Sequence, residues 1–288
     1  MASLRNSVGR ALRPLQSLLS SRSSKIVDPS AVLAWPDLPY SSEKECERRR
    51  IDVFVPGASV KAFPRESSSV LLVLHGGGFK MGSRKIPSIT EFANRCAQKH
   101  GLVTMSVGYR LGQDVHVETQ IGDVIDALFW AKENAGAFGG DPGRIFIAGH
   151  SAGAFLAMHA GISFHEHGGV QGIVGISGVY DLENLSTTVP RLGQAFVDRV
   201  INGTDSLERL KLAKSPRLAS FDRRMLLLMA QNELPLLKGD AFAIFNSPRR
   251  ARCILEEIPD SNHWSIMENS HTAACVAAFV ENKLSLKV

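Results

Sequence analysis

The stretch that most constrains the fold is Gly149-His150-Ser151-Ala152-Gly153. Four apolar, β-prone residues, 145–148, run directly into it, and good helix formers follow at 154–158. This order predicts a strand, a sharp turn and a helix. In such a turn a strained backbone lifts the serine hydroxyl above the sheet, and the glycines leave room where a side chain would collide. An ordinary glycine-rich turn between strand and helix gives the same short pattern, so other segments must decide.

Apolar runs alternate with helical patterns along the rest of the chain. Strands are expected at 51–55, 70–74, 102–107, 172–177, 225–229 and 253–258, and helices at about 87–99, 120–133, 239–246 and 265–283. Most of these strands are uniformly apolar, as in a sheet covered on both faces. The sequence therefore predicts an α/β fold with a mainly parallel central sheet and helices on both faces. Residues 185–220 are irregular and helix-rich, a candidate for a small cap.

Length and composition restrict the classes of protein to which this chain can belong. The 288 residues, 44% of them hydrophobic, suffice for one large α/β domain, expected at 28–288. The net charge of +5 is carried entirely by five basic residues of the first 25: Arg5, Arg10, Arg13, Arg22 and Lys25. The remaining domain is electrically balanced, which argues against nucleic-acid binding. No apolar run approaches the roughly 18 residues of a membrane span. The sequence carries no signal of oligomeric state.

Residues 1–27 place leucines and a valine at helical spacing among arginines and serines, without acids. This composition is typical of a mitochondrial transit peptide, and equally of an amphipathic helix or tail on the main domain. We expect a cytoplasmic protein, with the mitochondrial matrix as the alternative. The four cysteines lack metal-ligand spacing and are expected to be reduced and mostly buried: Cys46, Cys96, Cys253 and Cys275. No metal and no cofactor is predicted.

A second motif supports a nucleophilic role for Ser151. His75-Gly76-Gly77-Gly78-Phe79 follows the buried strand at 70–74. Serine attack on a carbonyl needs two backbone N–H groups aimed at the developing oxyanion, and a loop of glycines lets peptide hydrogens point inward. Gly76, Gly77 and Ala152 are the expected donors. The two motifs together favour a hydrolase site over two unrelated flexible turns.

The order Ser, acid, His then predicts where the partners lie. Glu233 follows the strand at 225–229 and is the preferred acid; Asp240 competes but should lie inside the next helix. Asp181 is too early for the usual acid and is expected to be structural or at the pocket edge, with a minor chance of serving instead. His263 follows the strand at 253–258 and is the preferred base, while His271 falls within the last helix.

The histidines beside the nucleophile have another expected role. His150 and His159 flank Ser151 but break the chain order required of the base. His150 is expected to be a packed or hydrogen-bonded neighbour. The remaining histidines are expected in surface or loop positions: His100, His116, His165 and His167.

Taken together, these segments resemble the α/β-hydrolase superfamily in its hormone-sensitive-lipase-like branch, and within it the kynurenine formamidases (arylformamidases). Residues 75–79 resemble their HGGxW motif and residues 149–154 their GHSAGA turn. Residues 176–182 are similar to their SGVYDL segment, Ser215-Pro216 to the Ser-Pro after it, and residues 260–269 to the segment around their catalytic histidine. The similarity covers roughly residues 50 to 285.

The resemblance implies Ser151 as nucleophile, His263 as base and Glu233 as acid, in an enzyme that hydrolyses N-formylkynurenine to kynurenine and formate. Phe79 stands where the formamidase motif has tryptophan, and Glu233 where the family usually has aspartate. Phe79 in place of tryptophan makes the substrate assignment less specific. Glutamate at position 233 can serve as the acid in place of aspartate. Two other functions stay open. One is a carboxylesterase acting on small acyl esters or a secondary metabolite, and the other a non-catalytic ligand receptor on the same fold.

Overall fold

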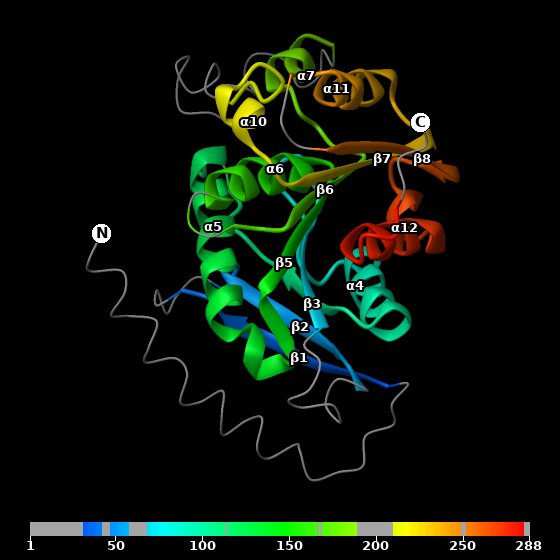
Figure 1. The fold of residues 1–288 in the computed structure, drawn as a ribbon. Coiled ribbons are helices and arrows are strands. Elements are labelled where there is room, and N and C mark those ends of the chain that lie inside the picture. The colour runs from blue at the N-terminus through cyan, green and yellow to red at the C-terminus, as the bar shows by residue number, and fades with distance from the viewer. Residues whose placement is uncertain are drawn as a thin grey trace.

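The computed structural model describes residues 31–41, 47–57, 68–112, 114–165, 167, 169–188, 210–248 and 252–284. Within them lies an eight-stranded sheet in the order β1-β2-β4-β3-β5-β6-β7-β8 (Figure 1). Its strands are β1 (Val32–Pro39), β2 (Arg50–Pro56), β3 (Ser68–Leu74), β4 (Val103–Val107), β5 (Gly140–His150), β6 (Gly172–Ile176), β7 (Arg224–Asn232) and β8 (Cys253–Asn262). β1 pairs antiparallel with β2, and β2 with β4, while all other pairs are parallel.

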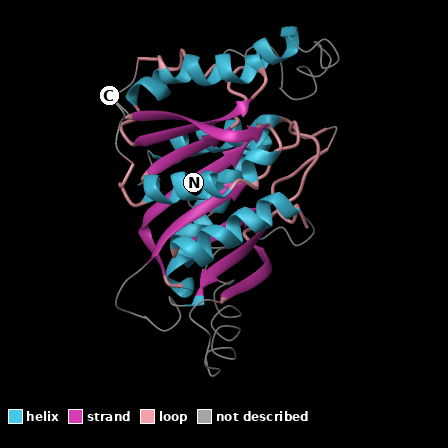
Figure 2. Ribbon diagram, turned by 90° about the vertical axis from the view of Figure 1, so that its right-hand side faces the viewer, coloured by secondary structure: helices cyan, strands magenta, loops and turns pink. Residues whose placement is uncertain are grey.

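Helices cover both faces of the sheet (Figures 1 and 2). Described helices are α4 (Pro87–His100), α5 (Val117–Asn134), α6 (Ala152–His165), α7 (Leu182–Thr188), α10 (Pro216–Ser220), α11 (Pro235–Phe245) and α12 (Ser270–Val280), with short 3₁₀ segments η1 (Ala135–Phe138) and η2 (Ser265–Met267). The α/β fold class, with its mainly parallel sheet, is thus confirmed. The segment 1–27 and most of the suggested cap at 185–220 lie outside the described residues.

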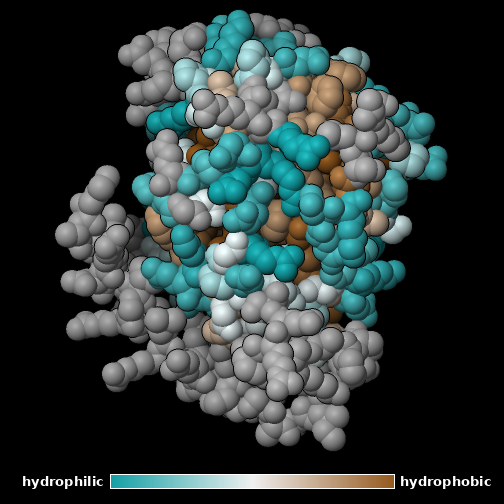
Figure 3. All heavy atoms as spheres, viewed as in Figure 1, coloured by the Kyte–Doolittle hydropathy of each residue, from teal (hydrophilic) through white to brown (hydrophobic). Residues whose placement is uncertain are grey.

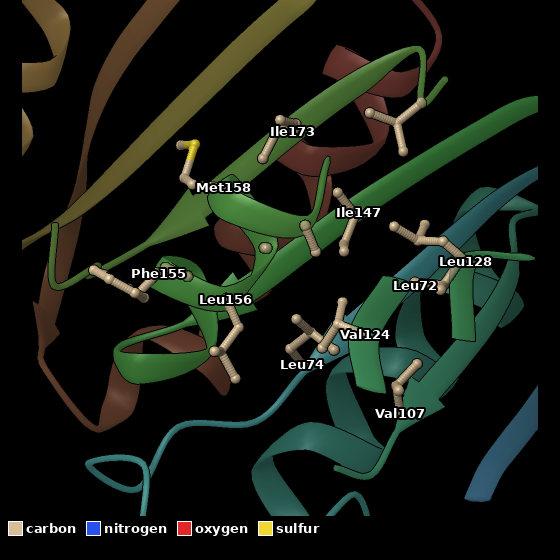
Figure 4. Close-up of a cluster of buried hydrophobic side chains, with 14 of the residues drawn as sticks. Leu72, Leu74, Val107, Val124, Leu128, Ile147, Phe155, Leu156, Met158 and Ile173 are labelled. Atoms are coloured by element: carbon tan, nitrogen blue, oxygen red, sulfur yellow. The ribbon is translucent and has the colours of Figure 1, made fainter. Parts of the chain in front are cut away.

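Strand β3 explains why the sheet needs helices on both sides. Its side chains alternate: Leu72 and Leu74 join the cluster packed under α5 and α6, shown in Figure 4, whereas Leu71 and Val73 join the cluster under α4 and α12. All four are fully buried. A strand that is apolar on both faces loses contact with water only between two helical layers. The outer face seen in Figure 3 is mostly hydrophilic, with a hydrophobic patch over α11.

The strand order also decides where a ligand can bind. β3 lies between β4 and β5, so the chain leaves β3 toward one side of the sheet and later returns to its other side. At such a switch point the loops after adjacent strands diverge and leave a crevice at their carboxyl ends. The register pairs Leu74 with Gly149, so the segments that follow β3 and β5 start side by side.

Several elements differ from the sequence-based expectation. β1 was not predicted, and the last predicted helix is two segments, η2 and α12. α11 begins at Pro235, four residues before the predicted start. On α5, whose apolar residues at 121, 124, 125, 128 and 129 mark one helical face in the sequence, Phe129 is 39% exposed, whereas the polar Gln120 and Asp123 are buried. Cys96, Cys253 and Cys275 are buried free thiols, as expected, and Cys46 lies outside the described residues.

Asp123 anchors α5 to the sheet and to the segment after β4. Its side chain is fully buried and lies 3.1 Å from Arg49 Nε and 2.7 Å from Arg110 Nη2. It also accepts the backbone N–H of Arg110 at 2.9 Å. Asp126, one helical turn later, pairs with Arg49 as well, but its side chain is 43% exposed.

We predict that Asp123→Ala lowers the free energy of unfolding by about 3–5 kcal/mol, because it removes the fully buried counter-charge that Arg49 and Arg110 share. Asp126→Ala, the matched control on the same helix, costs about 1 kcal/mol or less, because water replaces its contact. Chemical denaturation of both variants measures the difference. Equal losses would show that Arg49, and not the burial of Asp123, governs the effect.

Candidate active site

The turn after β5 has the strained form that its sequence predicts. Ser151 has φ of 54°, in the left-handed region that residues with a side chain rarely adopt. Its N–H donates to the Ile176 carbonyl at 2.9 Å. A Cβ on Gly149 would lie 2.1 Å from the Gly153 carbonyl oxygen, and one on Gly153 would lie 2.4 Å from that of His75. Both glycines are therefore required by close approach of the backbone, and the turn is fixed in place.

Three side chains predicted from separate loops lie in one hydrogen-bonded row. The Ser151 hydroxyl is 3.1 Å from His263 Nε2, and His263 Nδ1 is 3.0 Å from Glu233 Oε1. Glu233 follows β7 and His263 follows β8, so the ends of neighbouring strands supply both. Because the partner of Nδ1 is a carboxylate, Nδ1 carries the proton and Nε2 is free to accept one from the hydroxyl.

Glu233 lies in surroundings that keep it ionised. Its side chain is fully buried, which by itself raises the pKa of the carboxyl, but hydrogen bonds from His263 and Ser177 outweigh this and hold the pKa below its ordinary value. The N–H of Leu234 also donates to Oε1 at 3.0 Å.

The competing acids have other partners. Asp240 lies in α11 and accepts the backbone N–H groups of Tyr180 and Asp181, both at 3.0 Å, and the side chain of Asn184 at 3.0 Å. Burial raises the pKa of Asp240. Asp181 accepts the N–H of Asn184 at 3.0 Å and so caps the start of α7. The structure brings neither carboxylate to the imidazole of His263.

The alternative base is also displaced from the site. His271 is exposed on α12, where its backbone N–H donates to the Asn269 side chain. No hydrogen bond joins it to Ser151 among the residues that the structure describes.

The glycine loop after β3 lies against the serine turn. A Cβ on Gly76 would be 3.0 Å from the Ser151 Cβ, so the two main chains touch. Gly77 has φ of 122° and Gly78 of 58°, conformations that glycine adopts without strain. Ala152 is the first residue of α6, and its N–H has no partner within that helix. Gly76 and Ala152 therefore lie next to Ser151, and the Ala152 N–H is at the positive end of the α6 dipole.

His75 and Phe79, the first and last residues of the glycine motif, are buried and support the loop from the side of the core. His75 stacks on Tyr109 with ring centroids 4.3 Å apart, and its Nδ1 lies 2.7 Å from the Gly76 carbonyl. The Tyr109 hydroxyl donates to the His75 carbonyl at 2.8 Å. Phe79 has φ of 66°, is buried, and packs edge-on against Phe155 at 5.5 Å. Both motif side chains therefore face the core.

His150 joins the turn to the loop of the base, as the sequence suggested. Its Nε2 donates to the His263 carbonyl at 2.8 Å, and the two rings are 5.0 Å apart. Burial, and secondarily the charge of His263, lowers the pKa of His150 to about 4, so the ring is neutral at pH 7. The neutral ring holds the His263 main chain without competing for Ser151.

Two supporting residues were missed by the sequence reasoning. Gln120 on α5 donates from Nε2 to the Phe79 carbonyl at 2.7 Å and to the Arg110 carbonyl at 2.9 Å, and so fixes the glycine loop. Ser177, at the end of β6, has φ of 46°. The sequence places Gln120 on a helix face that its neighbours mark as apolar, which signals its burial but not its partners.

The described residues contain neither a metal-ligand cluster nor a helix that could span a membrane. Among the described residues, no three His, Cys, Asp or Glu side chains converge as metal ligands would. No described helix combines the length and apolar character that crossing a membrane demands.

The sheet carries the strained serine turn after one strand, a glycine loop beside that turn, and a Ser-His-Glu row at the carboxyl ends of its strands. This combination of fold and site is typical of serine hydrolases with an α/β fold. Residues 71–235, more than half of the chain, match the family described as the alpha/beta hydrolase fold. The chain belongs to this family, in its hormone-sensitive-lipase-like branch.

Curated relatives match over part of their length. The chain is 33% identical over 152 residues to esterase LipC of Mycobacterium tuberculosis (strain ATCC 25618 / H37Rv), covering 49% of this chain and 37% of that protein. It is 36% identical over 109 residues to arylacetamide deacetylase of Bos taurus, covering 37% and 26%. It is 37% identical over 94 residues to ethyl acetate hydrolase of Pseudomonas putida, covering 33% and 29%. The matched segments thus span less than two fifths of each relative.

Solved structures share the fold at low identity. An inhibited esterase B from Lactobacillus rhamnosis superposes with a TM-score of 0.71 at 18% identity, over 98% of both chains. A structure described as an arylesterase gives 0.69 at 17% identity, over 94% of this chain and 91% of that one.

The buried histidines make stability depend on pH. Burial lowers the pKa of His75 and of His150 from 6.5 to about 4. Between these values the unfolded chain takes up protons that the folded chain does not. We therefore expect full stability above about pH 6.5 and a progressive loss toward pH 4, at most about 3 kcal/mol per histidine.

Denaturant midpoints measured from pH 7 to 4.5 test this expectation. His150→Gln keeps a side-chain donor but cannot take up a proton, so its stability should fall less steeply over the interval than that of the parent. His271→Gln, at an exposed position, serves as the control and should follow the parent. Parallel curves for the parent and His150→Gln would contradict the assignment.

Proposed function

We propose that the protein is a serine hydrolase that cleaves carboxylic esters through an acyl-enzyme. The observation that carries the proposal is the row from the Ser151 hydroxyl through His263 to the buried, ionised Glu233, with contacts of 3.1 Å and 3.0 Å. The names of the relatives, which include an esterase, a deacetylase and an ethyl acetate hydrolase, support this class of reaction.

In the proposed reaction, His263 Nε2 takes the Ser151 proton as the hydroxyl oxygen attacks the ester carbonyl carbon. Glu233 stabilises the imidazolium, and the N–H groups of Gly76, Gly77 and Ala152 bind the oxyanion of the tetrahedral intermediate. His263 then gives its proton to the leaving alcohol as the carbon–oxygen bond breaks. A water molecule, deprotonated by the same imidazole, attacks the acyl-enzyme and releases the acid.

An aryl formamide is the second candidate substrate. It is favoured by the segments at 176–182 and 260–269, which resemble those of the kynurenine formamidases. The chemistry is the same except that an aryl amine leaves and formate is released. Comparison of kcat/KM for aryl formamides and for p-nitrophenyl esters of short acids separates the two candidates.

Ser151→Ala removes the nucleophile and leaves the buried contacts of the turn in place. We expect kcat for the preferred ester to fall by about 10⁴-fold or more, with an unchanged melting temperature. The parent protein should take one label from a fluorophosphonate probe and the variant none. An unlabelled, inactive parent would favour the non-catalytic receptor, and an active variant would show that another nucleophile operates.

The two carboxylates give a matched test of the acid. Glu233→Gln should lower kcat by about 10³- to 10⁴-fold, because the amide neither stabilises the imidazolium nor holds its tautomer. Asp240→Asn should change kcat by less than about 10-fold and act mainly on stability, since Asp240 binds only N–H groups near α7. A larger loss of kcat in Asp240→Asn would reverse the assignment.

A further inference from the structure

Exposed large apolar side chains are unevenly distributed over the described residues. Trp264 and Met81 are the most exposed, at 73% and 69%, followed by Leu234, Phe242 and Phe129. Single exposed apolar side chains are common on proteins. Here, however, Trp264 directly follows His263, and Met81 lies four residues after Gly77 in the glycine loop.

Trp264 is exposed although its main chain is fixed. Its N–H and that of Ser265 both donate to the Asn262 side chain, at 2.9 Å and 3.0 Å. Ile266 and Met267, which follow in the 3₁₀ segment η2, are buried. The indole stands edge-to-face with the His263 ring, at 4.9 Å and 86°. The turn thus holds a large apolar ring beside the imidazole and leaves most of it in water.

Met81 has the corresponding position on the glycine loop. Its N–H donates to the Gly77 carbonyl at 3.0 Å, and a Cβ on Gly77 would lie 3.1 Å from Met81 Cγ. Its side chain therefore begins against an expected oxyanion donor and extends into solvent. The loop leads into α4, whose Arg95 donates to the Glu268 carbonyl just after η2 at 2.7 Å. This bond joins α4, the helix that the glycine loop leads into, to the segment that follows Trp264.

On the basis of the proposed ester hydrolysis, we propose that Trp264 and Met81 bind the apolar group of the substrate, and that the preferred substrates are monomeric esters with an extended alkyl or aryl group. A carbonyl at Ser151 lies between the imidazole and the glycine loop, so a group projecting outward from it meets both side chains. Covering them removes apolar surface from water in the complex and favours larger apolar groups over acetate.

The test compares p-nitrophenyl octanoate with p-nitrophenyl acetate, both below the concentration at which octanoate forms micelles. The readout is the ratio of the two kcat/KM values, which is independent of the active fraction of each preparation. We expect the ratio to fall by about 10-fold or more in Trp264→Ser and in Met81→Ser. Phe129→Ser, at an exposed apolar position on α5, is the matched control and should keep the parent ratio.

The outcomes separate this inference from the proposed function. A parent protein that hydrolyses neither ester and takes no fluorophosphonate label would overturn the proposed function. A parent that hydrolyses both esters, with the same ratio in all variants, would overturn the inference and leave the function standing. Loss of binding to phosphatidylcholine vesicles in Trp264→Ser, with an unchanged ratio, would instead assign the exposed side chains to a lipid surface.

Discussion

The close approach of two main chains at the ends of β3 and β5 is the constraint on which the site depends. The strands are paired in parallel register, so the glycine loop and the serine turn begin side by side. Gly153 has no room for a side chain because the carbonyl oxygens of Leu74 and His75 would lie within 2.7 Å of a Cβ. The start of α6 therefore lies directly against the glycine loop, and contact between the two main chains fixes Ser151 beside that loop.

Burial and hydrogen bonding decide which titratable groups of the site are charged at pH 7. Burial keeps His75 and His150 neutral at pH 7, whereas hydrogen bonds keep the buried Glu233 ionised. Its nearest titratable partner is His263, which it contacts directly. A single buried charge among neutral rings acts mainly on the group it touches. The Glu233 carboxylate therefore acts mainly on the His263 imidazole, and it would stabilise the positive charge that this ring gains on taking a proton from Ser151.

Sequence reasoning placed the strands, both loops and the residues of the Ser-His-Glu row, because chain order and strand ends are local properties. It missed β1, where alternation is interrupted and Asp37 has a positive φ of 61° at the bulge. It preferred Glu233 to Asp240 by position alone, and only distances show which carboxylate reaches the imidazole. Gln120 could not be assigned a role, since its partner Phe79 lies 41 residues earlier in the chain. Long-range polar contacts have no periodic signature.

Contacts with buried residues fix the main chain of the glycine loop, whereas the Met81 side chain just after it is exposed. This difference bears on substrate specificity. Gln120 holds the Phe79 carbonyl, and the buried Arg84 pairs with Asp52 while its carbonyl accepts the Ser106 hydroxyl at 2.8 Å. These contacts form on folding, so a substrate need not spend binding energy to order the loop. Met81, just after the loop, and Trp264, beside His263, are by contrast exposed. Substitutions there can therefore change which substrate group is accepted while the alignment of the reacting atoms, determined by the main chain, is preserved.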